Sequence, residues 1–279
     1  MTHSLPAGSF VLSIETSNPS IVALTDSVVS FACGSGVALG KVTGANEIEL
    51  VVVEIFEART QGEKTPRRRA GSQIDRHDDQ LMPAIARLCE RAGVNPGDVK
   101  LVGVSVGPGG YTGLRIAITC AKMVCWLNDA ICIPVPSALS VVAATAKACS
   151  LPATVSVALA SKNERTWKYG TEPASAHVTT IVLPYTVTNI QVIDADSFDQ
   201  MTSDTLIADS HFPEQLRARA IERGVTLVHP LISPVAMLDL LPHLPAVSPE
   251  SLVPIYGRDP DAVTQWQAKV EHEAKQREV

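Results

Sequence analysis

The residues best suited to chemistry lie in one glycine-rich segment, residues 104–115, which reads Val-Ser-Val-Gly-Pro-Gly-Gly-Tyr-Thr-Gly-Leu-Arg. Glycine tolerates positive φ and lets other backbone approach closely, whereas Pro108 fixes one φ and lacks an N–H. An apolar run precedes the segment and a helix-like run follows it, so we expect a rigid corner between a strand and a helix. Free amides at the start of that helix could bind an anion. Because the spacing is neither Walker-type nor Gly-x-Gly-x-x-Gly, tight packing is an equal alternative to a phosphate cradle.

A second polar segment, Ser13-Ile-Glu-Thr-Ser17, follows the first apolar strand. A carboxylate there, beside a glycine corner, could supply the first half of a nucleotide site, although the second half of the chain has no matching glycine loop. The candidate nucleotide-binding residues are Glu15, Thr16, Gly107, Gly109, Gly110, Thr112 and Gly113.

Two halves of the chain must position these residues, and hydrophobic periodicity predicts the same order of elements in each. In the first half we expect strands at 10–14, 21–24, 28–33, 36–42, 48–56, 101–106 and 130–135, and helices at 79–92, 113–128 and 137–149. In the second half we expect a hairpin of strands at 153–160 and 165–169, strands at 178–183, 187–193, 205–208 and 225–229, and helices at 213–223 and 234–241.

A β-meander followed by strands that alternate with helices, occurring twice, is the outline of the actin/hexokinase/Hsp70-like (ASKHA) duplicated fold. Such alternation favours mixed sheets flanked by helices. A plain doubly wound α/β fold is the alternative, but it does not explain the opening meanders. We expect a first lobe at 1–138, a degenerate second lobe at 139–248, and a C-terminal segment and helix at 249–279 that pack back on the first lobe.

The helix expected after the glycine corner is unusually apolar. Arg115, Thr119 and Lys122 form one narrow polar stripe, whereas a helix that covers a sheet needs only one apolar stripe. This helix must therefore be buried on two sides, within its own domain or against another chain. With the preceding helix as its neighbour, the candidate partner interface is Leu81, Met82, Ile85, Leu88, Arg115, Ile116, Thr119, Lys122, Met123 and Trp126.

Composition narrows the classes of function. The chain is 46% hydrophobic and carries a formal charge of −6, which argues against binding nucleic acid through its overall field. The basic loop at 64–69 is an exception, interpreted as a solvated loop or, alternatively, an RNA contact. Six cysteines without a Cys-x-x-Cys pair indicate buried thiols in a reducing compartment. With no signal peptide or long apolar stretch evident, we expect a cytoplasmic protein without a membrane segment.

Four segments together resemble the bacterial TsaB (YeaZ) family. They are Ser13–Ser17, His77-Asp-Asp-Gln-Leu-Met-Pro83, the glycine segment through Ile116 with Ala121-Lys122, and Pro254-Ile-Tyr-Gly-Arg258 ahead of Trp266. The resemblance implies a non-catalytic subunit that dimerises with the metal-bearing relative TsaD. With the ATPase TsaE, that assembly transfers threonylcarbamoyl to the adenosine beside the tRNA anticodon. It further implies no cofactor of the chain's own, ATP/ADP and Mg at the level of the complex, and tRNA contacted only through the complex.

The catalytic relative carries a His-x-x-x-His pair, whose spacing points both imidazoles toward one metal. Here His77 is followed four residues later by Leu81, so we expect no metal ligands and no catalytic residues. Glu15 stands where the family usually has Asp, and Gly110-Tyr111 replaces the commoner Ser-Phe. Three alternatives stay open: an ASKHA-type phosphotransferase or metallopeptidase-like enzyme, an RNA-binding module, and self-association as a homodimer in the absence of a partner.

Overall fold

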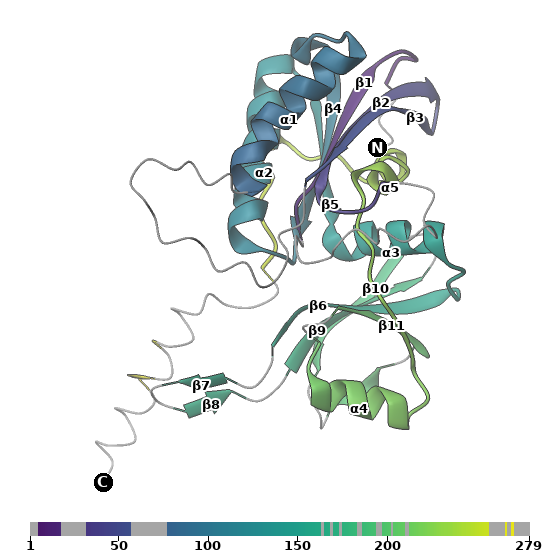
Figure 1. Ribbon diagram of the computed structural model, residues 1–279, viewed down its shortest axis with the longest axis vertical. Coiled ribbons are helices and arrows are strands. Elements are labelled where there is room, and N and C mark those ends of the chain that lie inside the picture. The colour runs from purple at the N-terminus through teal and green to yellow at the C-terminus, as the bar shows by residue number, and fades with distance from the viewer. Residues whose placement is uncertain are drawn as a thin grey trace. The chain divides into compact units, whose positions relative to one another are not determined.

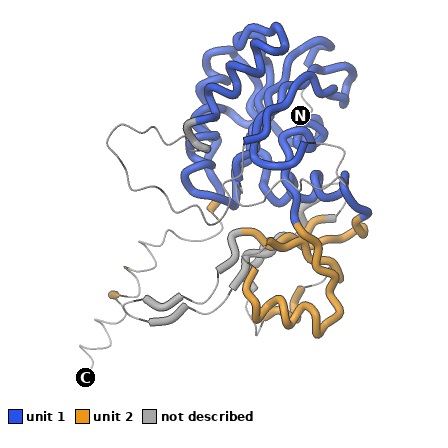
Figure 2. The backbone as a smooth tube through the Cα atoms, viewed as in Figure 1, with its two compact units in different colours: residues 1–150, 230–255 blue, residues 151–229, 256–279 orange. Residues whose placement is uncertain are grey.

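The computed structural model describes residues 5–17, 32–56, 77–162, 165–167, 170–172, 175–182, 186–193, 197–201, 203–209, 212–256, 266 and 269–270. The chain divides into two compact units, residues 1–150 with 230–255 and residues 151–229 with 256–279 (Figure 2). These bounds differ from the expected lobes, because residues 139–150 and 230–248 belong to the first unit. They pack there through α3 (Ser137–Ala148) and α5 (Pro234–Leu238).

The first unit contains a five-stranded mixed sheet in the order β3-β2-β1-β4-β5 (Figure 1). The strands β1, β4 and β5 are parallel, whereas β2 and β3 form an antiparallel hairpin on β1. Their bounds are β1 Phe10–Glu15, β2 Gly36–Gly44, β3 Glu47–Ile55, β4 Val99–Gly107 and β5 Ile131–Pro136. The buried runs of β1 and β4 explain why the sequence predicts these strands as nearly continuous apolar segments.

The second unit repeats this arrangement, with a sheet in the order β10-β9-β6-β11-β12. Its first strand again carries an antiparallel pair on one side and two parallel strands on the other. The bounds are β6 Thr154–Lys162, β9 Ser175–Val182, β10 Thr186–Ile193, β11 Thr205–Ala208 and β12 Thr226–Val228, with α4 at Glu214–Glu222. The strand order therefore recurs in both units, whereas the helix predicted at 234–241 in the second half belongs to the first unit, as α5.

The hairpin expected from strands 153–160 and 165–169 is wrong. The strand β6 pairs with β9 and β11, whereas β7 (Arg165–Trp167) pairs with β8 (Gly170–Glu172) in a separate two-stranded ribbon. The turn residues that follow β6 indicate only a local change of chain direction. The antiparallel partner of β6 is β9, which lies further along the chain. The strand expected at 21–24 and most of that at 28–33 lie outside the described residues.

Two helices cover one face of the first sheet: α1 (His77–Ala92) packs on β2 and β3, and α2 (Tyr111–Asn128) packs on β4 and against α1 (Figure 1). Helix α1 begins two residues earlier than predicted, and Pro83 lies inside it. There the proline removes one intrahelical hydrogen bond. The core beneath these helices includes Leu12, Leu39 and Val102 from the sheet.

Residues 230–255 follow the second unit in the sequence and pack against the first sheet. Helix α5 contacts β1, β2 and β3, and Leu241 lies so close to Gly103 that a Cβ at that glycine would be 2.3 Å from it. The chain then forms a bridge between Val247 and Cys132 on the edge strand β5. Its last part, residues 247–255, crosses beside α2 and is called the strap below.

Candidate functional site

The glycine corner is occupied by the protein's own backbone. The Gly110 N–H donates to the Ser17 carbonyl at 2.7 Å, and a Cβ on Gly109 would lie 2.0 Å from that same oxygen. Gly107 has φ +108°, and a Cβ there would lie 2.2 Å from the carbonyl oxygen of Ile255. These glycines are needed because other backbone segments approach within distances that no side chain permits. At Gly107 and Gly109 the geometry favours the tight-packing alternative over a phosphate cradle.

Glu15 is fully buried. Its Oε1 accepts hydrogen bonds from the Ser17 N–H at 2.8 Å and the Ser17 hydroxyl at 2.6 Å, and its Oε2 accepts one from the Ser140 hydroxyl on α3. Buried carboxylates require such donors, and here they come from the protein itself. The carboxylate therefore ties the end of β1 to α3.

The structure brings the other candidate nucleotide-binding residues together around the same corner. The Thr16 N–H donates to the Ser105 hydroxyl at 3.1 Å, and the Thr16 hydroxyl donates to the Gly113 carbonyl at 3.2 Å. Thr112 is exposed in the first turn of α2, whose N-cap residue Gly110 supplies no side-chain cap. Nucleotide binding by Thr112 and Gly113 stays a prediction.

Three of the residues assigned to a partner interface face inward instead. Leu81, Ile85 and Leu88 are exposed by 1%, 6% and 0%, and they pack in the core between α1 and the sheet. That part of the prediction is corrected, because an apolar stripe at helical spacing is the stripe that a helix needs to cover its own sheet. A partner cannot reach these side chains in the folded unit.

The remaining interface candidates lie toward solvent. Met82 on α1 and Met123 and Trp126 on α2 are 58%, 50% and 54% exposed, and Leu127 beside them is 78% exposed. Thr119 and Arg115 are also exposed, whereas Ile116 and Lys122 are half-buried. The Arg115 guanidinium stacks on the Tyr111 ring at 4.0 Å. The outer face of α2 thus combines apolar side chains with a polar stripe, and the described part of the unit does not bury it.

The strap adds contacts that the sequence does not reveal. The Trp126 indole N–H donates to a Glu250 carboxylate oxygen at 2.7 Å, and Lys122 Nζ lies 3.5 Å from the Glu250 carbonyl oxygen. The indole hydrogen bond is the main reason that the pKa of Glu250 lies below its ordinary value. Leu252 is buried in the core, and the Ile255 N–H donates to the Val106 carbonyl at 2.6 Å. The strap is therefore fixed along α2 from its C-terminal part to the glycine corner.

The cysteines are mostly buried thiols: five of the six are buried, and Cys149 is exposed. Burial raises the pKa of Cys33 and of Cys120 to about 11, which keeps both thiols protonated near neutral pH. Cys120 Sγ lies 3.2 Å from Met82 Sδ, so it packs α1 against α2. Among the described residues no three His, Cys, Asp or Glu side chains are grouped so as to hold a metal ion. The side chain of His77 and the basic loop at 64–69 lie outside the described part of the chain.

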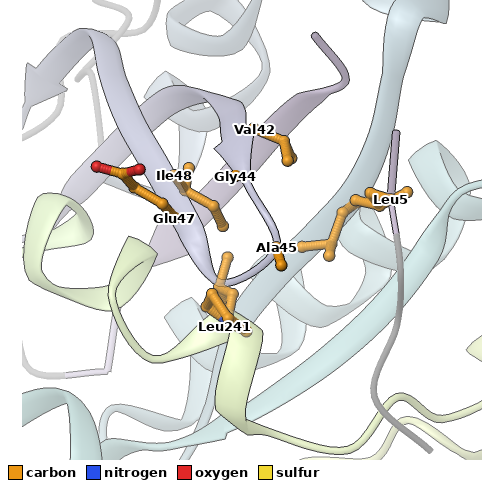
Figure 3. Close-up of a pocket in the computed structure, with 9 residues that line it drawn as sticks. Leu5, Val42, Gly44, Ala45, Glu47, Ile48 and Leu241 are labelled. Carbon is orange, nitrogen blue, oxygen red and sulfur yellow. The ribbon is translucent and has the colours of Figure 1, made fainter. Parts of the chain in front are cut away.

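A small apolar pocket lies at the hairpin between β2 and β3 (Figure 3). Leu5, Val42, Ile48 and Leu241 line it, and Glu47 lies at its rim. Its free volume of about 20 Å³ holds about one water molecule. This pocket is too small to bind a nucleotide.

A strand order that occurs in both units and helices that cover mixed sheets define an ASKHA-like α/β protein. The fold is shared with two solved structures from Pseudomonas aeruginosa. One is YeaZ (TM-score 0.55, 16% identity, covering 88% of this chain and 100% of that one). The other is an uncharacterized protein with similarity to peptidase YeaZ (TM-score 0.54, 16% identity, covering 90% and 100%). The predicted fold class is confirmed.

Sequence comparison finds two partial matches. The model for TsaD, tRNA N6-adenosine threonylcarbamoyltransferase, matches residues 71–171, which include α1 and α2. The tRNA threonylcarbamoyladenosine biosynthesis protein TsaB of Bacillus subtilis (strain 168) is 40% identical over 53 residues. That stretch covers 19% of this chain and 23% of the relative. Both sequence matches are partial: over these stretches the chain is similar to the TsaD family and to TsaB. In the described part of the chain, no helix is long and apolar enough to span a membrane.

Proposed function

We propose that the chain is a TsaB-like subunit for threonylcarbamoyl transfer to the adenosine beside the tRNA anticodon. It acts as a scaffold and activator of a TsaD-like catalytic subunit and carries no complete active site of its own. It binds that subunit through the outer faces of α1 and α2. The observation that carries the proposal is the group of exposed apolar side chains on these helices, Met82, Met123, Trp126 and Leu127.

Contact between these side chains and a partner would supply most of the free energy of association. The gain is about 25 cal/mol per Å² of apolar area removed from water, less the entropic and desolvation costs of binding. Arg115, Thr119 and Lys122 would set register and orientation. In this proposal a TsaE-like ATPase joins the complex, ATP/ADP and Mg act at that level, and tRNA is contacted through the complex. Without the partner, the same face would form a two-fold homodimer.

The test is copurification of the TsaD-like subunit from the organism's own extract, together with the threonylcarbamoyladenosine content of tRNA after depletion of this chain. Met123→Asp should weaken partner binding by more than about tenfold, because it buries a carboxylate in an apolar contact. Ile221→Asp is the matched control, since Ile221 is an exposed apolar residue on α4 of the second unit. Unchanged binding of the Met123 variant would contradict the proposed interface.

The alternative is an active phosphotransferase or metallopeptidase-like enzyme. A phosphotransferase would need a solvent-accessible carboxylate beside the first strand that could bind a metal and phosphate. Glu15 is instead buried, and its carboxylate accepts hydrogen bonds from the hydroxyls of Ser17 and Ser140. Metal content of the purified chain and nucleotide turnover without a partner separate the two functions. Stoichiometric metal or steady turnover would overturn the scaffold role.

A further inference from the structure

We propose that the strap forms part of the partner-binding surface, so that the TsaD-like subunit contacts Val253 and Ile255 in addition to α1 and α2. The inference rests on the proposed function and extends it. It assigns a binding role to a segment that begins 119 residues after the end of α2 in the sequence.

The exposed apolar side chains of the first unit are not scattered. Among its described residues nine large apolar side chains are exposed, of which Leu50 and Val51 lie on β3. The other seven lie on α1, α2 and the strap: Met82, Tyr111, Met123, Trp126, Leu127, Val253 and Ile255. Val253 is 61% exposed, more than any of the five on α1 and α2 except Leu127, which is 78% exposed.

The direction of the strap side chains follows from its extended backbone. Leu252 has φ −69° and ψ 113°, and it is buried in the core shared with α2. Successive side chains of an extended segment point to opposite sides. Val253 therefore points away from the core, in agreement with its exposure to solvent.

The strap is fixed before any partner binds. Its anchors are the bridge between Val247 and Cys132, the hydrogen bond between Trp126 and Glu250, and the hydrogen bond from Ile255 to Val106. A segment held at both ends and in the middle loses little conformational entropy on binding. Less of the free energy gained from its apolar contacts is therefore offset by ordering.

The exposed apolar area also supports a role for the strap. At roughly 100 Å² for each half-exposed large side chain, the five on the helices present roughly 500 Å², which lies within the range of about 300–600 Å² for the largest apolar patch of a typical monomer. Adding Val253 and Ile255 brings the apolar surface to roughly 700 Å², which is above that range and is typical of an interaction site. The occupant is the TsaD-like subunit, because the TsaD family model matches the residues that form both helices and the partner can present an equivalent pair.

The experiment measures the dissociation constant between the full chain and the TsaD-like subunit of the same organism, by calorimetric titration. Val253→Asp is compared with Val51→Asp, because Val51 is also an exposed valine, 42% accessible, but lies on β3. We expect Val253→Asp to weaken binding by at least about tenfold and Val51→Asp to leave it within about twofold. Thermal unfolding should change little in either variant, since both side chains are exposed.

The outcomes are distinguishable. Loss of binding by Val253→Asp with unchanged unfolding supports the role of the strap. If Met123→Asp abolishes binding but Val253→Asp does not, the strap lies outside the interface, and the proposed function stands without this inference. If the wild-type chain fails to bind the TsaD-like subunit, the proposed function falls and the inference falls with it.

Discussion

At the scale of single residues, the glycine pattern of residues 107–113 is compatible with two roles, anion binding and close backbone packing. Glycines after a strand can expose amides to a phosphate or admit other backbone. Here the carbonyls of Ser17 and Ile255 lie where side chains of Gly109 and Gly107 would be. The sequence predicts the rigid corner but not its occupant, because Ser17 and Ile255 are distant in the chain.

Replacing Gly109 by alanine tests this packing. A Cβ 2.0 Å from the Ser17 carbonyl forces backbone to move, so we expect Gly109→Ala to lower the free energy of unfolding by about 3 kcal/mol. Gly97→Ala is the control, because its Cβ would meet only the flexible Asn95 side chain at 3.2 Å, and it should change stability by less than about 1 kcal/mol. Chemical denaturation measures both. Equal effects would show that the corner has room.

The role of Glu15 does not follow from its residue type and its position in the sequence. A carboxylate at the end of a first strand is consistent with a metal-orienting role, and only the fold shows that Ser140, 125 residues away, closes over it. The same holds for Leu81, Ile85 and Leu88, whose spacing predicts one apolar stripe but not whether sheet or partner covers it.

At the scale of elements, the contact between the strap and α2 has a pH dependence of known sign. Hydrogen bonding from Trp126 lowers the pKa of the Glu250 carboxyl below its ordinary value of 4.5. A group with a lowered folded-state pKa contributes stability above its unfolded pKa and loses it as the pH falls through the folded value. The hydrogen bond should therefore keep its full strength at neutral pH and weaken only below pH 4.5, as the carboxylate becomes protonated.

The indole N–H resonance of Trp126 reports this transition, with the exposed Trp266 as an internal reference. We expect a midpoint below 4.5. Glu250→Gln should abolish the transition, because the amide oxygen accepts a hydrogen bond but does not titrate. A midpoint at or above the ordinary value would show that the carboxylate is not held by the indole in solution.

Elements with strong local signals are predictable, whereas their partners often are not. The buried strands β1 and β4 and the helices α1 and α2 follow from apolar runs and periodicity. The pairing of β6 with β9 does not, because a turn signal at 161–164 specifies a change of direction but not which strand returns. The strap has no periodic signal, and its position depends on tertiary contacts.

At the scale of the whole molecule, the first unit is discontinuous in sequence, and this has consequences for folding. Residues 230–255 contribute side chains that are almost fully buried in it, among them Met237, Leu238, Leu241 and Leu252. A chain that ends at Ser150 would lack them and would expose the apolar faces that they cover. The stability of the unit therefore depends on residues that follow the whole second sheet.

We expect residues 1–150 alone to show no cooperative unfolding transition by circular dichroism. Joining residues 230–255 to Ser150 through a flexible linker should restore one, because the second unit has its own sheet and its own core cluster around Phe198 and Leu206. Leu241→Asp in the joined chain is the control, since it places a charge against Gly103 beneath the sheet. A cooperative transition in residues 1–150 alone would show that the returning segment is an accessory to the core and not a part of it.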